Sequence, residues 1–183
     1  MVAVSAFLWG VLVLELYLGG ARSGKSRLAE QRLCEPTSQR IYLATATAGD
    51  AEMAARISHH QQQRAADDWR TVEAPEELST AIKQYASPQT AILVDCLTLW
   101  LSNWLAKEDD DSWQMVKGQF LHTIAAAPGH IVLVSNEVGQ GIVPLGTLTR
   151  RFVDESGRLH QDIAAIADRV VFVTAGLEQV LKN

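Results

Sequence analysis

Eight residues near the start of the chain, Gly-Gly-Ala-Arg-Ser-Gly-Lys-Ser at positions 19–26, constrain it more than any other feature. They fit the pattern G-x-x-x-x-G-K-[ST]. In that pattern backbone N–H groups turn toward phosphate oxygens, the lysine reaches the outer phosphates, and the last hydroxyl ligates Mg²⁺. The apolar residues 16–18 are typical of a strand, and residues 27–33 are helix formers. A chance glycine-rich turn is the alternative, but this setting favours a nucleoside triphosphate site.

The composition narrows the class of protein. The chain has 183 residues, 48% of them hydrophobic, which suits one domain with a substantial core. Its net charge of −5 argues against a large nucleic-acid footprint, which needs a basic face. Cys34 and Cys96 have no metal or redox spacing, so a reducing cytoplasm is expected. Cys96 lies in an apolar run and is expected to be a buried thiol.

Residues 1–14 are strongly apolar and carry no charged side chain. They lack the basic region of a signal peptide, and Glu15 interrupts them before membrane-spanning length, so we expect no stable membrane insertion. The segment could extend the first strand, form an arm toward a partner, or be an extension that the fold does not need. We favour the last, with one domain over residues 15–183, because a strand needs only about five or six residues.

Strand and helix patterns alternate along the chain. Short apolar runs predict strands at residues 15–18, 40–45, 91–97, 131–135 and 169–174. Helices are predicted at residues 25–33, 51–64, 75–85, 112–126 and 149–167. Pro75 followed by two glutamates is typical of a helix start, and the acids at 109–111 indicate a loop and an N-cap. The order predicts an α/β fold of the P-loop NTPase type, with a doubly wound, mainly parallel sheet flanked by helices.

Polar residues at predicted strand ends are the next candidates, since carboxyl ends of parallel strands face the ligand. Four apolar residues precede Asp95, as in the strand whose acid holds the P-loop Mg²⁺, although a strand-end cap is the alternative. Thr45 could bond a phosphate or sugar, or be a structural hydroxyl. Residues 136–139 are expected to form a substrate-side loop. The guanine-reading motif Asn-Lys-x-Asp is absent, which argues against a GTPase switch.

If residues 51–64 are helical, Arg56, His60 and Arg64 share one face. Two arginines beside an imidazole form a place for phosphates with a nucleophile between them. From spacing alone, a solvated polar helix with an incidental histidine pair is the better interpretation. A zinc site is not favoured, because the adjacent His59 and His60 diverge on a helix.

Taken together, the motifs resemble those of the bifunctional adenosylcobinamide kinase/adenosylcobinamide-phosphate guanylyltransferase family of cobalamin biosynthesis. The resemblance runs from about Leu16 to the C-terminus. It includes the P-loop, residues 42–45, residues 52–57 ahead of the histidine pair, residues 69–71, residues 135–139, residues 141–144, and Gly157-Arg158.

The resemblance implies a multifunctional transferase, a homotrimer, that acts twice on one substrate. The kinase step moves the γ-phosphoryl group of ATP or GTP onto the hydroxyl of adenosylcobinamide. A histidine then attacks the α-phosphorus of GTP, and adenosylcobinamide phosphate takes the GMP to give adenosylcobinamide-GDP. Storing the nucleotide on a histidine divides one displacement into two easier ones.

By this resemblance His60 is the nucleophile, with His59 its nearest competitor, and Lys25 neutralises charge in the transition state. Ser26 and Asp95 would hold Mg²⁺. The nucleotide contacts would come from Gly19, Gly20, Ala21, Arg22, Ser23, Gly24, Lys25, Ser26, Ala44, Thr45, Ala46, Gln61, Gln62, Gln63, Arg64, Glu73 and Asp95. Gln61–Gln63 replace a more charged stretch of the family, and Asp95 stands where Glu is frequent.

Two other classes of function stay open at this point. A P-loop small-molecule kinase without guanylyltransferase activity predicts γ-phosphoryl transfer and no covalent nucleotide. A non-enzymatic nucleotide-binding module predicts tight binding with slow hydrolysis. The resemblance also makes residues 1–14 and the helix around residues 100–105 candidates for a subunit interface, the alternative for that helix being the core.

Overall fold

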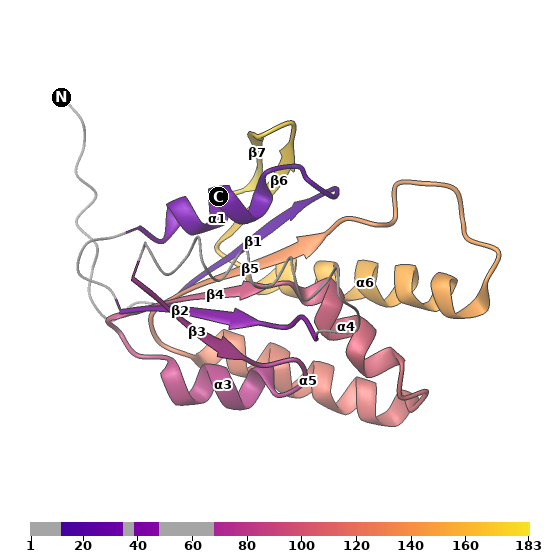
Figure 1. The fold of residues 1–183 in the computed structure, drawn as a ribbon, viewed down its shortest axis with the longest axis horizontal. Helices are drawn as coiled ribbons and strands as arrows, with labels where there is room; N and C mark the ends of the chain where they lie inside the picture. Colours follow the sequence, from indigo (N-terminus) through magenta and orange to yellow (C-terminus); the bar gives the residue numbers. More distant parts are fainter. Residues whose placement is uncertain (1–11, 35–38, 48–67) are drawn as a thin grey trace.

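The computed structural model describes residues 12–34, 39–47 and 68–183. The helix predicted at 51–64, with His60 and residues Gln61–Arg64, lies outside these ranges, as does nearly all of the apolar segment 1–14. Figure 1 shows one sheet with helices packed against it. No helix within the described ranges is long and apolar enough to cross a bilayer.

The sheet has seven strands in the order β3-β2-β4-β5-β1-β6-β7. The strands are β1 (Val13–Gly19), β2 (Gln39–Ala44), β3 (Trp69–Glu73), β4 (Thr90–Asp95), β5 (His130–Asn136), β6 (Arg169–Thr174) and β7 (Leu177–Lys182). Neighbouring strands are parallel except β6 and β7. The predicted α/β class with a mainly parallel sheet is confirmed.

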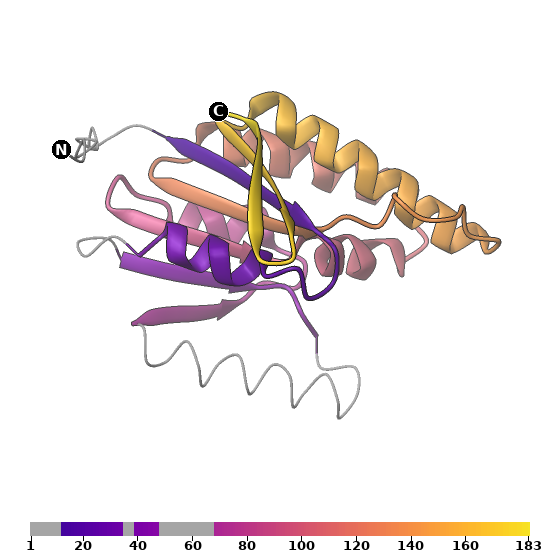
Figure 2. The same cartoon turned by 90° about the horizontal axis from the view of Figure 1, so that it is seen from above.

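Helices cover both faces of this sheet (Figure 2). They are α1 (Lys25–Arg32), α3 (Leu78–Tyr85), α4 (Leu97–Leu105), α5 (Asp110–Ala126) and α6 (Thr147–Ile166). In β1, β2, β4, β5 and β6, alternate buried residues divide between two cores, as the two-residue period of a strand requires. Leu16 and Leu133 belong to the core beneath α3 to α6, whereas Tyr17 and Val134 belong to the core beneath α1.

Two strands were not predicted, and one begins earlier than expected. The edge strand β7 is exposed along its whole length, so it lacks the apolar run of a buried parallel strand. At the other edge, β3 has only one buried residue, Trp69. β1 begins at Val13 rather than Glu15: Val13 and Leu14 pair with β5, and Leu14 is buried. These two residues of the apolar segment therefore belong to the sheet.

The predicted helix start at Pro75 is wrong by three residues, since α3 begins at Leu78. The carbonyl groups before it accept hydrogen bonds from α4 instead of starting a helical turn. Asn103 Nδ2 donates to the Pro75 oxygen at 2.9 Å, and Trp100 Nε1 donates to the Glu76 oxygen at 2.8 Å. These tertiary contacts hold residues 75–77 in an irregular conformation.

The apolar side chains of α4 belong to the core of this chain. Trp100 and Leu101 are fully buried, and the Trp100 ring centroid lies 5.3 Å from that of Trp113 on α5 and 4.7 Å from that of Phe120. Of the two interpretations of residues 100–105, the core is therefore the one observed. The N-cap before α5 is confirmed at Asp109, whose side chain accepts from Ser112 N at 3.1 Å.

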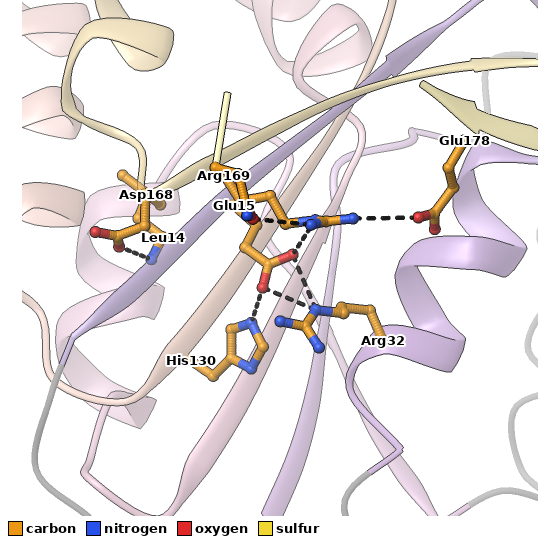
Figure 3. A network of polar contacts seen from close by, with 8 residues as sticks. Leu14, Glu15, Arg32, His130, Asp168, Arg169 and Glu178 are labelled. Atoms are coloured by element: carbon orange, nitrogen blue, oxygen red, sulfur yellow. Dashed lines mark hydrogen bonds and ion pairs between the residues drawn. The ribbon is translucent and has the colours of Figure 1, made fainter. Parts of the chain in front are cut away.

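A buried carboxylate holds the sheet together at the edge where the parallel strands begin (Figure 3). Glu15 on β1 is 1% exposed. Its Oε1 accepts from Arg32 Nε of α1 at 2.9 Å and lies 3.0 Å from His130 Nε2 of β5. Arg169 Nε of β6 lies 3.8 Å from the other oxygen. Burial raises the pKa of Glu15, but His130 and Arg32 outweigh it, so the pKa lies below its ordinary value.

Candidate nucleotide-binding site

The candidate site lies at the carboxyl edge of the sheet, where β1, β5, β4, β2 and β3 end side by side. The registers place Gly19 opposite Asn136, and Ala44 between Asp95 and Glu73. Open α/β sheets bind ligands at this edge. The fold thus places the P-loop and the predicted residues of the other described strands along one edge, with Asp95 two strands from β1 and Glu73 four.

The P-loop connects β1 to α1 in a conformation that requires glycine at two positions. A Cβ on Gly19 would lie 2.4 Å from the Val173 oxygen of β6, which real contacts do not permit. Gly24 is the N-cap of α1 with φ of +94°, a left-handed conformation that favours glycine. Ser23 O accepts from Gly176 N at 2.8 Å, so the tight β6–β7 turn supports the loop from outside. The predicted Gly-rich strand-to-helix turn is confirmed.

Lys25 and Asp95 lie within electrostatic reach of each other. Lys25 is buried, and its Nζ donates to the Gly20 oxygen at 3.1 Å, across the loop that it follows. Burial lowers the pKa of Lys25, while the negative charge of Asp95 opposes that shift. Asp95 Oδ2 accepts from the Tyr42 hydroxyl at 3.0 Å, which orients the carboxylate at the end of β4.

The oxygen atoms of Asp95 and Ser26 are suitable ligands for a magnesium ion. Mg²⁺ takes oxygen ligands and keeps several waters, so one carboxylate and one hydroxyl beside nucleotide phosphates suffice. Asp95 and Ser26, the second residue of α1, offer such oxygens on adjoining elements. Within the described ranges no three His, Cys, Asp or Glu side chains gather into a metal-binding group, so a fully protein-bound metal site is not seen there.

Of the two roles considered for Thr45, the structure shows the structural hydroxyl. Its side chain is fully buried; Oγ1 accepts from Cys96 N at 2.7 Å and also lies 2.7 Å from the Cys96 oxygen, to which it donates. The backbone carbonyl oxygen of Thr45 accepts from Asn103 Nδ2 at 3.0 Å. The hydroxyl therefore joins the ends of β2 and β4 and is not free for a phosphate. Cys96 is buried, as predicted, and burial raises the pKa of its thiol.

Polar contacts connect the residues at the end of β5 to the P-loop and to α6, and the sequence did not predict these contacts. Glu137 N donates to the Gly19 oxygen at 3.1 Å, and Glu137 Oε1 accepts from Gly139 N at 2.6 Å. His160 of α6 lies behind this turn, with Nε2 2.7 Å from Ser135 Oγ and Nδ1 3.7 Å from Glu137 Oε2. The segment 136–139 was predicted as a substrate-side loop, but no local pattern points to His160, which comes to it through the packing of α6.

His160 predicts a pH dependence of stability. Burial lowers its pKa, and the charge of Glu137 opposes this incompletely, so the folded state binds the proton less readily than the unfolded chain, in which the pKa is about 6.5. The neutral imidazole therefore makes its full contribution to the free energy of unfolding above that pH. As the pH falls below it, this contribution is lost at a rate that approaches about 1.4 kcal/mol per pH unit. In urea denaturation at pH 7.5 and 5.5, we expect wild type to lose more stability than His160→Gln. Equal losses would contradict this assignment.

The sheet, the P-loop and the oriented acid define the class of protein: a P-loop NTPase fold. Its backbone resembles that of an ATPase from the type III secretion system of pathogenic bacteria, with a TM-score of 0.55 at 10% identity over 93% of this chain and 57% of that one. It also resembles the RadB recombinase, with a TM-score of 0.54 at 12% identity over 90% and 75% of the two chains. At these identities the likeness concerns the fold alone.

The chain belongs to the cobinamide kinase / cobinamide phosphate guanyltransferase family, whose model matches residues 15–181. It is 49% identical to the bifunctional adenosylcobalamin biosynthesis protein CobP of Pseudomonas aeruginosa, over 92% of this chain and 97% of that protein. It is 42% identical to the bifunctional adenosylcobalamin biosynthesis protein CobU of Escherichia coli, over 91% and 98%. The family resemblance inferred from the motifs is confirmed.

Proposed function

We propose that this protein phosphorylates adenosylcobinamide with ATP or GTP and then transfers GMP from GTP to adenosylcobinamide phosphate. The GMP passes through a covalent intermediate on His60, and the product is adenosylcobinamide-GDP. The observation that carries the proposal is the P-loop with Lys25 and Asp95 at the carboxyl edge, in a chain of this family.

The residues act by placing charge where the reaction needs it. Backbone N–H groups of residues 19–26 and the Lys25 ammonium would bind phosphates and stabilise the charge that develops on transfer. Ser26 and Asp95 would hold Mg²⁺, which when bound neutralises phosphate charge. Ala44, Ala46 and Glu73, at the ends of neighbouring strands, would contact the nucleotide farther along the edge, as would Gln61, Gln62, Gln63 and Arg64.

We further propose that the enzyme works in the cytoplasm as a homotrimer. Exposed apolar side chains between β5 and α6 support an association surface. Ile142 and Leu145 are each 97% exposed, and Val143 lies between them with 72% exposed. Clusters of this kind mark interaction sites on soluble proteins. In Figure 1 this connection extends well beyond the sheet.

The test is a labelling experiment with the full chain, Mg²⁺ and GTP labelled at the α-phosphate. We expect wild type and His59→Ala to retain acid-labile, alkali-stable label, and His60→Ala to retain none, because only His60 attacks phosphorus. Adding adenosylcobinamide phosphate should discharge the label. Label on His60→Ala but not on His59→Ala would move the nucleophile to His59. Absence of label from all three, with γ-phosphoryl transfer to adenosylcobinamide intact, would leave a kinase alone.

A further inference from the structure

The carboxylate of Glu137 is the feature at the carboxyl edge that the proposed function has not used. Among the acids that follow described strands, it is the nearest to the P-loop along the edge. Glu137 follows β5, the direct neighbour of β1, and its N–H bonds to the first P-loop residue, Gly19. Asp95 lies one strand farther. Glu73 lies four strands from β1, or about 19 Å at about 4.8 Å per strand.

The Glu137 side chain is held in place while one oxygen stays available. Oε1 accepts from Gly139 N at 2.6 Å, which closes a tight turn. Oε2 lies 3.7 Å from His160 Nδ1, beyond hydrogen-bonding distance. The side chain is 22% exposed, so a ligand or water can reach it. A carboxylate that is fixed at one oxygen and open at the other is suited to accept a proton.

Ser135, His160 and Glu137 follow the order hydroxyl, imidazole and carboxylate that serine hydrolases use. Burial excludes that chemistry here, because Ser135 is 1% exposed and His160 is 6% exposed. No substrate carbonyl could reach the hydroxyl. Glu137 is the exposed member of the three, and the imidazole lies behind its carboxylate.

We propose that Glu137 is the general base of the phosphoryl-transfer step, an inference that rests on the proposed function. The substrate hydroxyl oxygen forms a bond to the γ-phosphorus as the bond from that phosphorus to the β,γ-bridging oxygen breaks. The hydroxyl proton passes to Glu137 Oε2, and the nucleoside diphosphate leaves with the bridging oxygen. Glu137 then releases the proton to solvent. Gly139 N–H is the positioning group for the carboxylate.

The decisive variant is Glu137→Gln, whose amide oxygen can still accept from Gly139 N–H but whose side chain cannot take a proton. We expect kcat for phosphorylation of adenosylcobinamide to fall about 10²- to 10³-fold. The acidic limb of the wild-type pH–kcat profile should disappear. The affinity for a fluorescent GTP analogue and the labelling by α-labelled GTP should stay within twofold, which shows that the variant is folded. Glu30→Gln, on the last turn of α1, is the matched control with unchanged turnover.

The outcomes separate the two proposals. If wild type phosphorylates adenosylcobinamide and Glu137→Gln does so at a rate within threefold, the base is another group and this inference is overturned. If Glu137→Gln loses nucleotide affinity as much as turnover, Glu137 has a structural role and the inference is likewise overturned. If wild type itself transfers no phosphoryl group to adenosylcobinamide, the proposed function fails.

Discussion

Lys25→Ala is expected to lower γ-phosphoryl transfer about 10²- to 10³-fold while leaving the fold intact. Lys25 is the P-loop residue whose charged side chain is buried, and its ammonium group donates a hydrogen bond to the Gly20 carbonyl oxygen. Without the Lys25 ammonium, the negative charge that develops on the transferred phosphoryl group loses a fixed positive partner in a site that is largely closed to water. The rate is measured with γ-labelled nucleotide under single-turnover conditions, so that binding and transfer are separated.

The same burial makes the stability of this variant informative. Desolvation disfavours the Lys25 ammonium, as its lowered pKa indicates, so alanine removes an unfavourable burial together with one hydrogen bond. We expect the free energy of unfolding to stay within about 1 kcal/mol of wild type. Lys83→Ala, an exposed lysine in the last turn of α3, should leave the rate within twofold. A Lys25→Ala rate within tenfold of wild type would exclude this lysine from the transfer step.

Glu15→Gln is expected to destabilise the protein by about 3 kcal/mol, the lower end of the cost of breaking a buried ion pair. The substitution is nearly isosteric, so it leaves no cavity, but it leaves Arg32, His130 and Arg169 around a neutral amide. Both arginines are partly exposed and can turn toward water, which keeps the cost near that limit. For a chain of this length the loss corresponds to a fall in Tm of about 6–12 °C.

The control for this network is Glu178→Gln at its exposed rim. Glu178 Oε2 lies 3.3 Å from Arg169, the same cation that reaches Glu15, but it stands on the edge strand with its side chain 32% exposed. Exposed pairs contribute about 1 kcal/mol or less. Thermal melts and urea denaturation of the two variants measure the difference. Equal destabilisation would mean that burial of Glu15 is not the source of its contribution.

The part of the fold around the P-loop could largely be predicted, because its signals are local. A P-loop is a contiguous pattern, and the strands β2, β4, β5 and β6 are short apolar runs that only a sheet covered on both faces can bury. The acid at Asp95 could be placed beside the P-loop for the same reason, since parallel strands end at a common edge. The edge strands β3 and β7 could not, because strands buried on one face or none have mixed composition.

The sequence by itself determined the P-loop, the α/β class and the family, since each rests on patterns of residues that stand close together in the chain. Only the tertiary structure decided which polar groups meet. In the tertiary structure the Thr45 hydroxyl bonds to the Cys96 backbone, Gly176 N–H bonds to the P-loop, and His160 lies behind Glu137. These partners are separated by between 23 and 153 residues, so no local spacing encodes them. They meet because strand order and helix packing are set by burial of the whole core.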